Sequence, residues 1–215
     1  MRNLLPQNWI TRIIWLALLV AAISALLSGR WSLAFVAVAA IGLSLLPVLF
    51  AERFSIRLPQ SFIAVITIIV FAAVFLGEAF DFYERYWWWD IALHGMSSIG
   101  FGLIGFLFVF MLFEGDRYAA PPLALAFFAY CFAVAIGSAW EIFEFAMDQT
   151  FGFNMQKSGL LDTMGDLIVD MIGAGIGATA GFLFLKRWRF AGLVYLIRQF
   201  IRENRHFYRK DDDED

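Results

Sequence analysis

Long apolar segments separated by short polar connections dominate the chain. Six of them are close to, or longer than, the roughly 20 residues that a helix needs to cross a bilayer. Their apolar positions do not alternate with period two, which excludes the strands of a transmembrane barrel. The pattern therefore predicts six membrane-spanning helices, at about residues 10–28, 31–50, 61–80, 88–113, 121–147 and 163–185.

The composition supports an all-α membrane protein. Of the 215 residues, 61% are hydrophobic and only 16% are charged, which is too apolar for a soluble domain. The connections are too short to form a soluble domain, so residues 1–186 are predicted to form one polytopic helical domain. We expect a multi-pass protein of the plasma or inner membrane, with the lipid bilayer as its partner and no binding of nucleic acid. The sequence leaves the oligomeric state open.

The basic residues are distributed unevenly over the predicted connections. With six crossings both termini share one side, and 13 of the 16 lysines and arginines fall on that side. The other side holds only Arg30, Arg85 and Lys157. Because basic residues near helix ends are retained in the cytoplasm, we predict that both termini are cytoplasmic.

The segment after the last span has a different pattern. Residues 187–210 place apolar residues at spacings of three and four and arginines on another face, which is typical of a basic amphipathic helix at a membrane interface. A solvated helix is the alternative. Residues 211–215 are all acidic and are predicted to be a disordered terminus. The apolar positions are Leu193, Val194, Ile197 and Ile201, and the basic ones are Arg198, Arg202, Arg205 and Arg209.

Acidic residues gather at the ends of the third to sixth predicted spans. In the predicted topology all of these ends lie at the extracytoplasmic surface, together with the only histidine inside a span, His94. A carboxylate in hydrocarbon is costly unless it is paired, hydrated or metal-bound, so such groups are candidates for function. They are ten of the chain's 19 carboxylates: Glu78, Asp81, Glu84, Asp90, Glu141, Glu144, Asp148, Asp162, Asp166 and Asp170.

Helical spacing places these acids on narrow faces. At about 100° per residue, Asp162, Asp166 and Asp170 fall within about 80° of one another. Three glycines continue the same stripe, and a glycine ridge lets a neighbouring helix approach closely. We therefore expect the acidic face of the last span to point into the bundle. The three glycines are Gly173, Gly177 and Gly181.

Carboxylates at close range cannot all remain ionised without positive charge. A bound divalent ion, protons or a water-filled pocket could supply the balance. Oxygen ligands with one imidazole suit Mg²⁺, Mn²⁺, Ca²⁺ or Zn²⁺. Ser97 and Ser98 lie one turn from His94, and we interpret them as packing residues. The predicted metal ligands are Asp90, His94, Glu141, Glu144, Asp166 and Asp170, and the candidate catalytic groups are His94, Asp166 and Glu141.

Three functions fit this pattern. The leading hypothesis is a divalent-metal-dependent enzyme that acts on a lipid or lipid-linked substrate. The alternatives are a cation- or proton-coupled transporter or channel, which would use the same acids as a relay, and a structural membrane protein of the cell envelope. The inner halves of the last three spans have no further ionisable groups of the kind that a long relay would need.

The combined spacing resembles that of a known family. Asp90-x3-His94, Glu141-Ile-Phe-Glu144 and Asp166-x3-Asp170-Met-Ile-Gly-Ala look like the pattern of the YjdF-like inner-membrane proteins, over roughly residues 80–185. This resemblance implies a polytopic inner-membrane protein and no particular reaction. A more distant likeness is to the VanZ-like membrane proteins, but the asparagine that usually follows their final aspartate is missing at the matching place.

Overall fold

The computed structural model describes residues 8–113, 120–188 and 192–208, and within these residues the chain is helical without strands. Six helices are long and apolar enough to cross a membrane, as the sequence predicted. The chain divides into two compact units, Met1–Trp89 and Asp90–Asp215, and three spans fall largely in each. The spans are Trp9–Leu27, Trp31–Arg53, Gln60–Ala79, Trp89–Leu112, Pro122–Phe151 and Leu160–Leu185.

The N-terminal unit packs through small residues. Helices α1 (Trp9–Leu27) and α2 (Trp31–Arg53) place alanines at their contact, and Leu18 and Phe75 complete the core. The third span is composite, because α3 (Gln60–Val70) passes into a π-helical segment, η1 (Phe71–Leu76), before the short α4. The unit ends in two short helices, α4 (Gly77–Ala79) and α5 (Phe82–Arg85).

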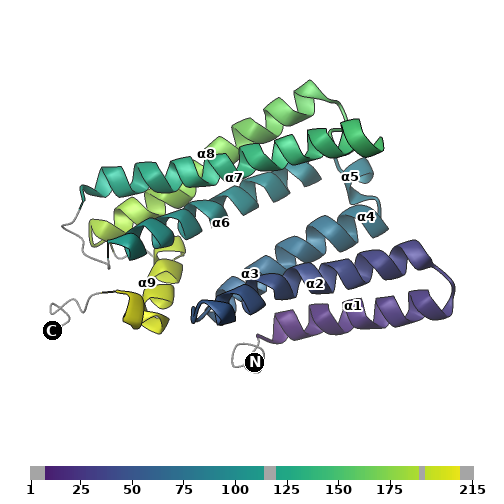
Figure 1. Ribbon diagram of the computed structural model, residues 1–215, viewed down its shortest axis with the longest axis horizontal. Helices are drawn as coiled ribbons and strands as arrows, with labels where there is room; N and C mark the ends of the chain where they lie inside the picture. Colours follow the sequence, from purple (N-terminus) through teal and green to yellow (C-terminus); the bar gives the residue numbers. More distant parts are fainter. Residues whose placement is uncertain (1–7, 114–119, 189–191, 209–215) are drawn as a thin grey trace. The chain divides into compact units, whose positions relative to one another are not determined.

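The C-terminal unit is a bundle of three long helices with a shorter fourth. Figure 1 shows α6, α7 and α8 running alongside one another, with α9 turned across their direction. Pro121 and Pro122 begin α7, where a missing backbone N–H does no harm. Gly152 ends it in the left-handed conformation that glycine adopts easily. The bounds are α6 Trp89–Leu112, α7 Pro122–Phe151, α8 Leu160–Leu185, α9 Leu193–Glu203 and the 3₁₀ turn η2 Arg205–Phe207.

Glycines bring α6 and α8 into backbone contact. A Cβ atom at Gly173 would lie 2.7 Å from the carbonyl oxygen of Gly95, and one at Gly102 would lie 2.9 Å from the Cα atom of Gly177. The predicted glycine ridge of the last span therefore faces α6. Because this ridge continues the stripe of Asp166 and Asp170, the same contact carries both aspartates into the bundle, where each is only 3% exposed.

Helix α9 packs its apolar face against the bundle. Val194 and Ile197 are buried, and Phe200 continues the same face. Beyond α9, the Tyr208 hydroxyl donates a hydrogen bond to the Leu107 carbonyl oxygen of α6 at 3.4 Å, and its ring stacks on Phe110. Protein contacts thus occupy much of the apolar face of α9.

The structure extends two of the predicted spans. Helix α7 continues to Phe151, so Glu141, Glu144 and Asp148 lie within a helix rather than at its end. Helix α8 begins at Leu160, which places Asp162 in its first turn. The predicted acidic terminus, residues 211–215, and residues 189–191 and 209–210 of the predicted 187–210 helix lie outside the described residues. The cytoplasmic location of both termini stays a prediction.

Candidate functional site

Three helices of the C-terminal unit contribute to one buried polar cluster. His94 and Asp90 lie one turn apart on α6, Glu141 lies on α7, and Asp166 and Asp170 lie one turn apart on α8. Four of these five residues are buried, while the Asp90 side chain is 26% exposed. Asp90, at the beginning of α6, is therefore the most exposed member of the cluster.

Asp170 holds the imidazole of His94 from one side. Its carboxylate oxygens lie 3.3 and 3.4 Å from Nδ1 of His94, and the Ser98 hydroxyl donates a 2.5 Å hydrogen bond to Oδ1. Carboxylate oxygens accept hydrogen bonds, so this contact suits a proton on Nδ1 of His94. Nε2 of His94 lies on the opposite edge of the ring.

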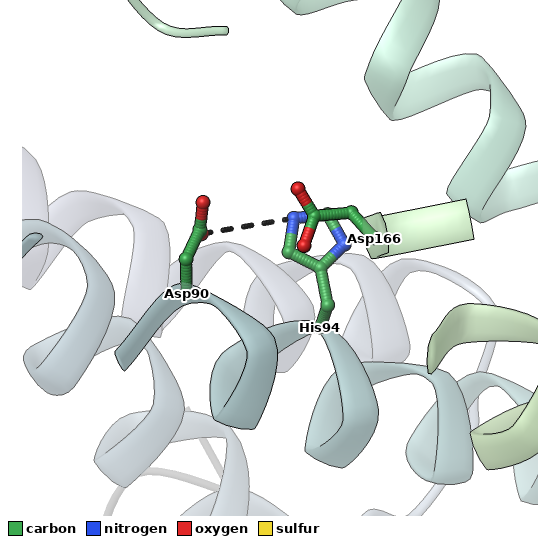
Figure 2. A group of neighbouring side chains, drawn as sticks. All are labelled: Asp90, His94 and Asp166. Atoms are coloured by element: carbon green, nitrogen blue, oxygen red, sulfur yellow. Dashed lines mark ion pairs between the residues drawn. The ribbon is translucent and has the colours of Figure 1, made fainter. Parts of the chain in front are cut away.

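The Nε2 edge faces two other carboxylates. Nε2 lies 3.8 Å from Oδ1 of Asp90 and 3.8 Å from Oε1 of Glu141. Asp90, His94 and Asp166 each offer one ligand atom, and these three atoms lie within 4.8 Å of one another. Figure 2 shows Asp90 and His94 rising from the same helix while Asp166 reaches toward them from another. This set of donors could hold a metal ion.

Glu141 is the least satisfied member of the cluster. It is only 4% exposed, and neither of its carboxylate oxygens has a hydrogen-bond partner of normal geometry among the described residues. The Thr163 hydroxyl is near enough to interact with Glu141: it accepts a 2.6 Å hydrogen bond from Gln156 and keeps its own O–H to donate. Buried carboxylates without a partner are rare because desolvation is costly. Glu141 therefore marks a place for a further positive group.

The other acids that the sequence analysis singled out have different contacts. Asp170 contacts Nδ1 of His94 instead of the Nε2 edge. The carboxylate of Glu144 accepts a 2.9 Å hydrogen bond from the indole of Trp140. Asp148 accepts the backbone N–H groups of residues 155 and 156 and so fixes the connection to α8. Glu78, Asp81 and Glu84 belong to the N-terminal unit.

Two positions beside Asp170 were not recognised as site residues in the sequence. Ser98 was interpreted as a packing residue, yet it donates to Asp170. The signal was its spacing, since positions four apart such as His94 and Ser98 share a helix face. Gly137 of α7 lies against the Asp170 carboxylate, so that a Cβ atom there would overlap it. Only the packing of α7 on α8 reveals this contact.

We expect Gly137→Ala to cost about 1 kcal/mol of unfolding free energy, the lower end of the range for overpacking, because the Asp170 side chain can partly give way. The displaced carboxylate would also lose its hold on His94. Unfolding of the purified protein in detergent measures the change. Gly100→Ala is the control, because a Cβ atom there meets nothing within 4 Å. Equal effects of the two variants would contradict the close contact.

Comparison with known proteins places the chain in a family. The family model described as "Predicted membrane protein (DUF2238)" matches residues 7–187. The chain belongs to this family. A Thermotoga maritima protein described as "Uncharacterized protein" is 35% identical over 105 residues. The match covers 48% of this chain and 53% of the relative, so the chain spans about half the length of the curated relative it matches. No solved structure matches the chain.

The DUF2238 match includes all six spans and every residue of the cluster. The description of the family agrees with the architecture of a multi-pass membrane protein. Helix α9 begins at Leu193, beyond the matched residues. The cluster is therefore part of the region that defines membership of the DUF2238 family, whereas α9 lies outside that region.

Proposed function

We propose that the cluster is a divalent metal site of a membrane enzyme that acts on a lipid or lipid-linked substrate. Asp90, His94 and Asp166 are the ligands, and Glu141 completes the site. The single observation that carries the proposal is the buried Glu141 carboxylate, which lacks a hydrogen-bond partner of normal geometry among the described residues and lies 3.8 Å from Nε2 of His94.

The arrangement around His94 supports metal binding. In metal sites, a ligating histidine usually donates its other ring N–H to a carboxylate, which fixes the tautomer and the ring orientation. Asp170 has this relation to His94, and Ser98 in turn holds Asp170. One imidazole with two or three carboxylates suits Zn²⁺ or Mn²⁺, and Mg²⁺ or Ca²⁺ would rely mainly on the oxygens.

The chemistry follows from the ligand types. A divalent ion at this place would polarise a phosphoryl or carbonyl oxygen and activate water. Glu141 is placed to accept a proton as general base, since its carboxylate makes no hydrogen bond of normal geometry among the described residues. Asp170 and Ser98 keep His94 oriented and do not themselves need to touch a substrate.

The depth of the site favours a substrate held in the membrane. Trp87, Trp88 and Trp89 directly precede Asp90, and tryptophan is enriched at the level of the lipid headgroups. At 1.5 Å per residue, His94 lies about 7 Å deeper than Trp89 along α6. A lipid headgroup or the linkage of a lipid-linked molecule reaches this depth without leaving the bilayer.

A transport function has less support. The inner part of the C-terminal unit is filled by an aromatic cluster, in which Phe106 is fully buried and Phe110 and Phe184 are nearly so. The described inner halves of α6, α7 and α8 carry no aspartate, glutamate, lysine, arginine or histidine that could continue a relay. Beyond the cluster the bundle is therefore filled by aromatic side chains. The likeness to YjdF-like proteins does not favour either function.

The test is a metal titration of the purified full chain after treatment with a chelator. We expect one Zn²⁺ or Mn²⁺ ion per chain by elemental analysis, and a rise in Tm as the ion binds the folded state. Glu141→Gln should weaken binding about tenfold, consistent with the loss of a supporting carboxylate. Glu144→Gln, one turn further on the same helix, is the matched control and should bind as the wild type does.

The enzymatic part needs a separate readout. The metal-loaded protein is incubated with phospholipids and with lipid-linked phosphates in liposomes, and mass spectrometry follows their conversion. Products that form with wild type and not with Glu141→Gln support the enzyme. If the wild type binds none of Zn²⁺, Mn²⁺, Mg²⁺ and Ca²⁺, the metal site is ruled out. If liposomes show a metal-dependent ion flux and no conversion of any lipid, the transporter is favoured.

A further inference from the structure

The C-terminal end of the described chain presents a strongly basic surface. Arg198, Arg202 and Arg205 are exposed on α9 and the turn that follows it, and the end of α8 adds two more exposed cations. Trp188 and Tyr195 are also exposed, by 51% and 56%. We call this surface the basic platform, and its cations are Lys186, Arg187, Arg198, Arg202 and Arg205.

Protein contacts hold the basic platform in place. The buried Val194 and Ile197 anchor one face of α9 on the bundle. The guanidinium of Arg198 donates a 3.3 Å hydrogen bond to the carbonyl oxygen of Trp188 and lies 6.0 Å from the ring centre of Phe184. An interfacial helix usually inserts its apolar face into lipid. Here packing against the protein takes up that face and leaves the basic one outward.

We propose that the basic platform binds the anionic phospholipid headgroups of the leaflet in which α8 ends, by charge and without insertion of α9 among acyl chains. The platform begins directly after the sixth span ends at Leu185, so it lies at the level of the headgroups. Clusters of cations at this position attract anionic lipid. Exposed tryptophan and tyrosine prefer the same interfacial layer.

The test uses the full chain in a neutral detergent, titrated with phosphatidylglycerol or with phosphatidylcholine while Tm is followed. Phosphatidylglycerol should raise the Tm of the wild type and phosphatidylcholine should not. For Arg202→Gln with Arg205→Gln, the phosphatidylglycerol concentration that gives half the rise should increase about tenfold or more. The matched control is Arg30→Gln with Arg85→Gln, two exposed arginines of the N-terminal unit, which should behave as the wild type does.

Two further measurements separate charge from insertion and from misfolding. In about 1 M NaCl, where the Debye length is only about 3 Å, the effect of phosphatidylglycerol should disappear. Arg202→Lys with Arg205→Lys should restore it. The proposal is overturned by a glutamine variant that responds as the wild type does, by a response that persists in high salt, or by a wild type that prefers neither lipid. The last result would favour an acidic protein partner.

Discussion

Gly177→Ala is expected to destabilise the C-terminal unit by about 3 kcal/mol, the upper end of the range for overpacking. A Cβ atom at this position would lie 2.5 Å from the carbonyl oxygen of Ile99 and 2.8 Å from the Cα atom of Gly102. Both are backbone atoms of α6, so no side chain can rotate out of the way. The two helices must therefore separate at this contact. Unfolding of the protein in detergent measures the loss.

The matched control for this variant lies two residues away. Gly175 faces open space, since a Cβ atom there meets nothing within 4 Å. Gly175→Ala should stabilise the helix by about 0.5–1 kcal/mol, because alanine loses less backbone entropy than glycine. If Gly177→Ala were as harmless as Gly175→Ala, the backbone contact between α6 and α8 would be wrong.

The fold could be predicted from the sequence because its main signals are local. The length and apolarity of each segment predicted all six spans. The structure differs from the predicted spans where tertiary contacts determine how far a helix extends. Helix α7 extends through Glu141 and Glu144 to Phe151 because its polar face has partners in the bundle and at Trp140. The hydrophobicity of residues 61–80 does not distinguish an α-helix from a π-helix, so it could not predict that η1 interrupts the third span.

The candidate site could be predicted in part. Periodicity and the glycine ridge predicted that Asp166 and Asp170 turn inward, and the structure contains the expected cluster of acids with His94. Periodicity could not tell which edge of the imidazole each carboxylate would face. That depends on the close approach of α6 and α8, which places Asp170 at Nδ1 and leaves Nε2 to Asp90 and Glu141. The catalytic and ligand roles stay predictions.

Asp166→Asn is expected to lower the affinity for a divalent ion by more than about 100-fold. Loss of a carboxylate that only orients a metal ligand, without touching the ion, already lowers metal affinity by about 10–100-fold. Asp166 belongs to the group of three that could hold the ion directly, so its loss should cost more. The amide keeps one weak oxygen donor but removes the negative charge. A titration with Zn²⁺ or Mn²⁺, followed by Tm and by elemental analysis, measures the change.

Asp162→Asn is the control that distinguishes coordination by Asp166 from a general loss of negative charge. Asp162 lies one turn earlier on α8, carries the same charge and is outside the group of three. A general loss of negative potential would affect both variants alike, whereas coordination by Asp166 affects only one. Equal affinities for the two variants would mean that the ion is held by diffuse charge. Unchanged affinity in Asp166→Asn would mean that α8 contributes no ligand, because Asp170 is already engaged with Nδ1 of His94 and with Ser98.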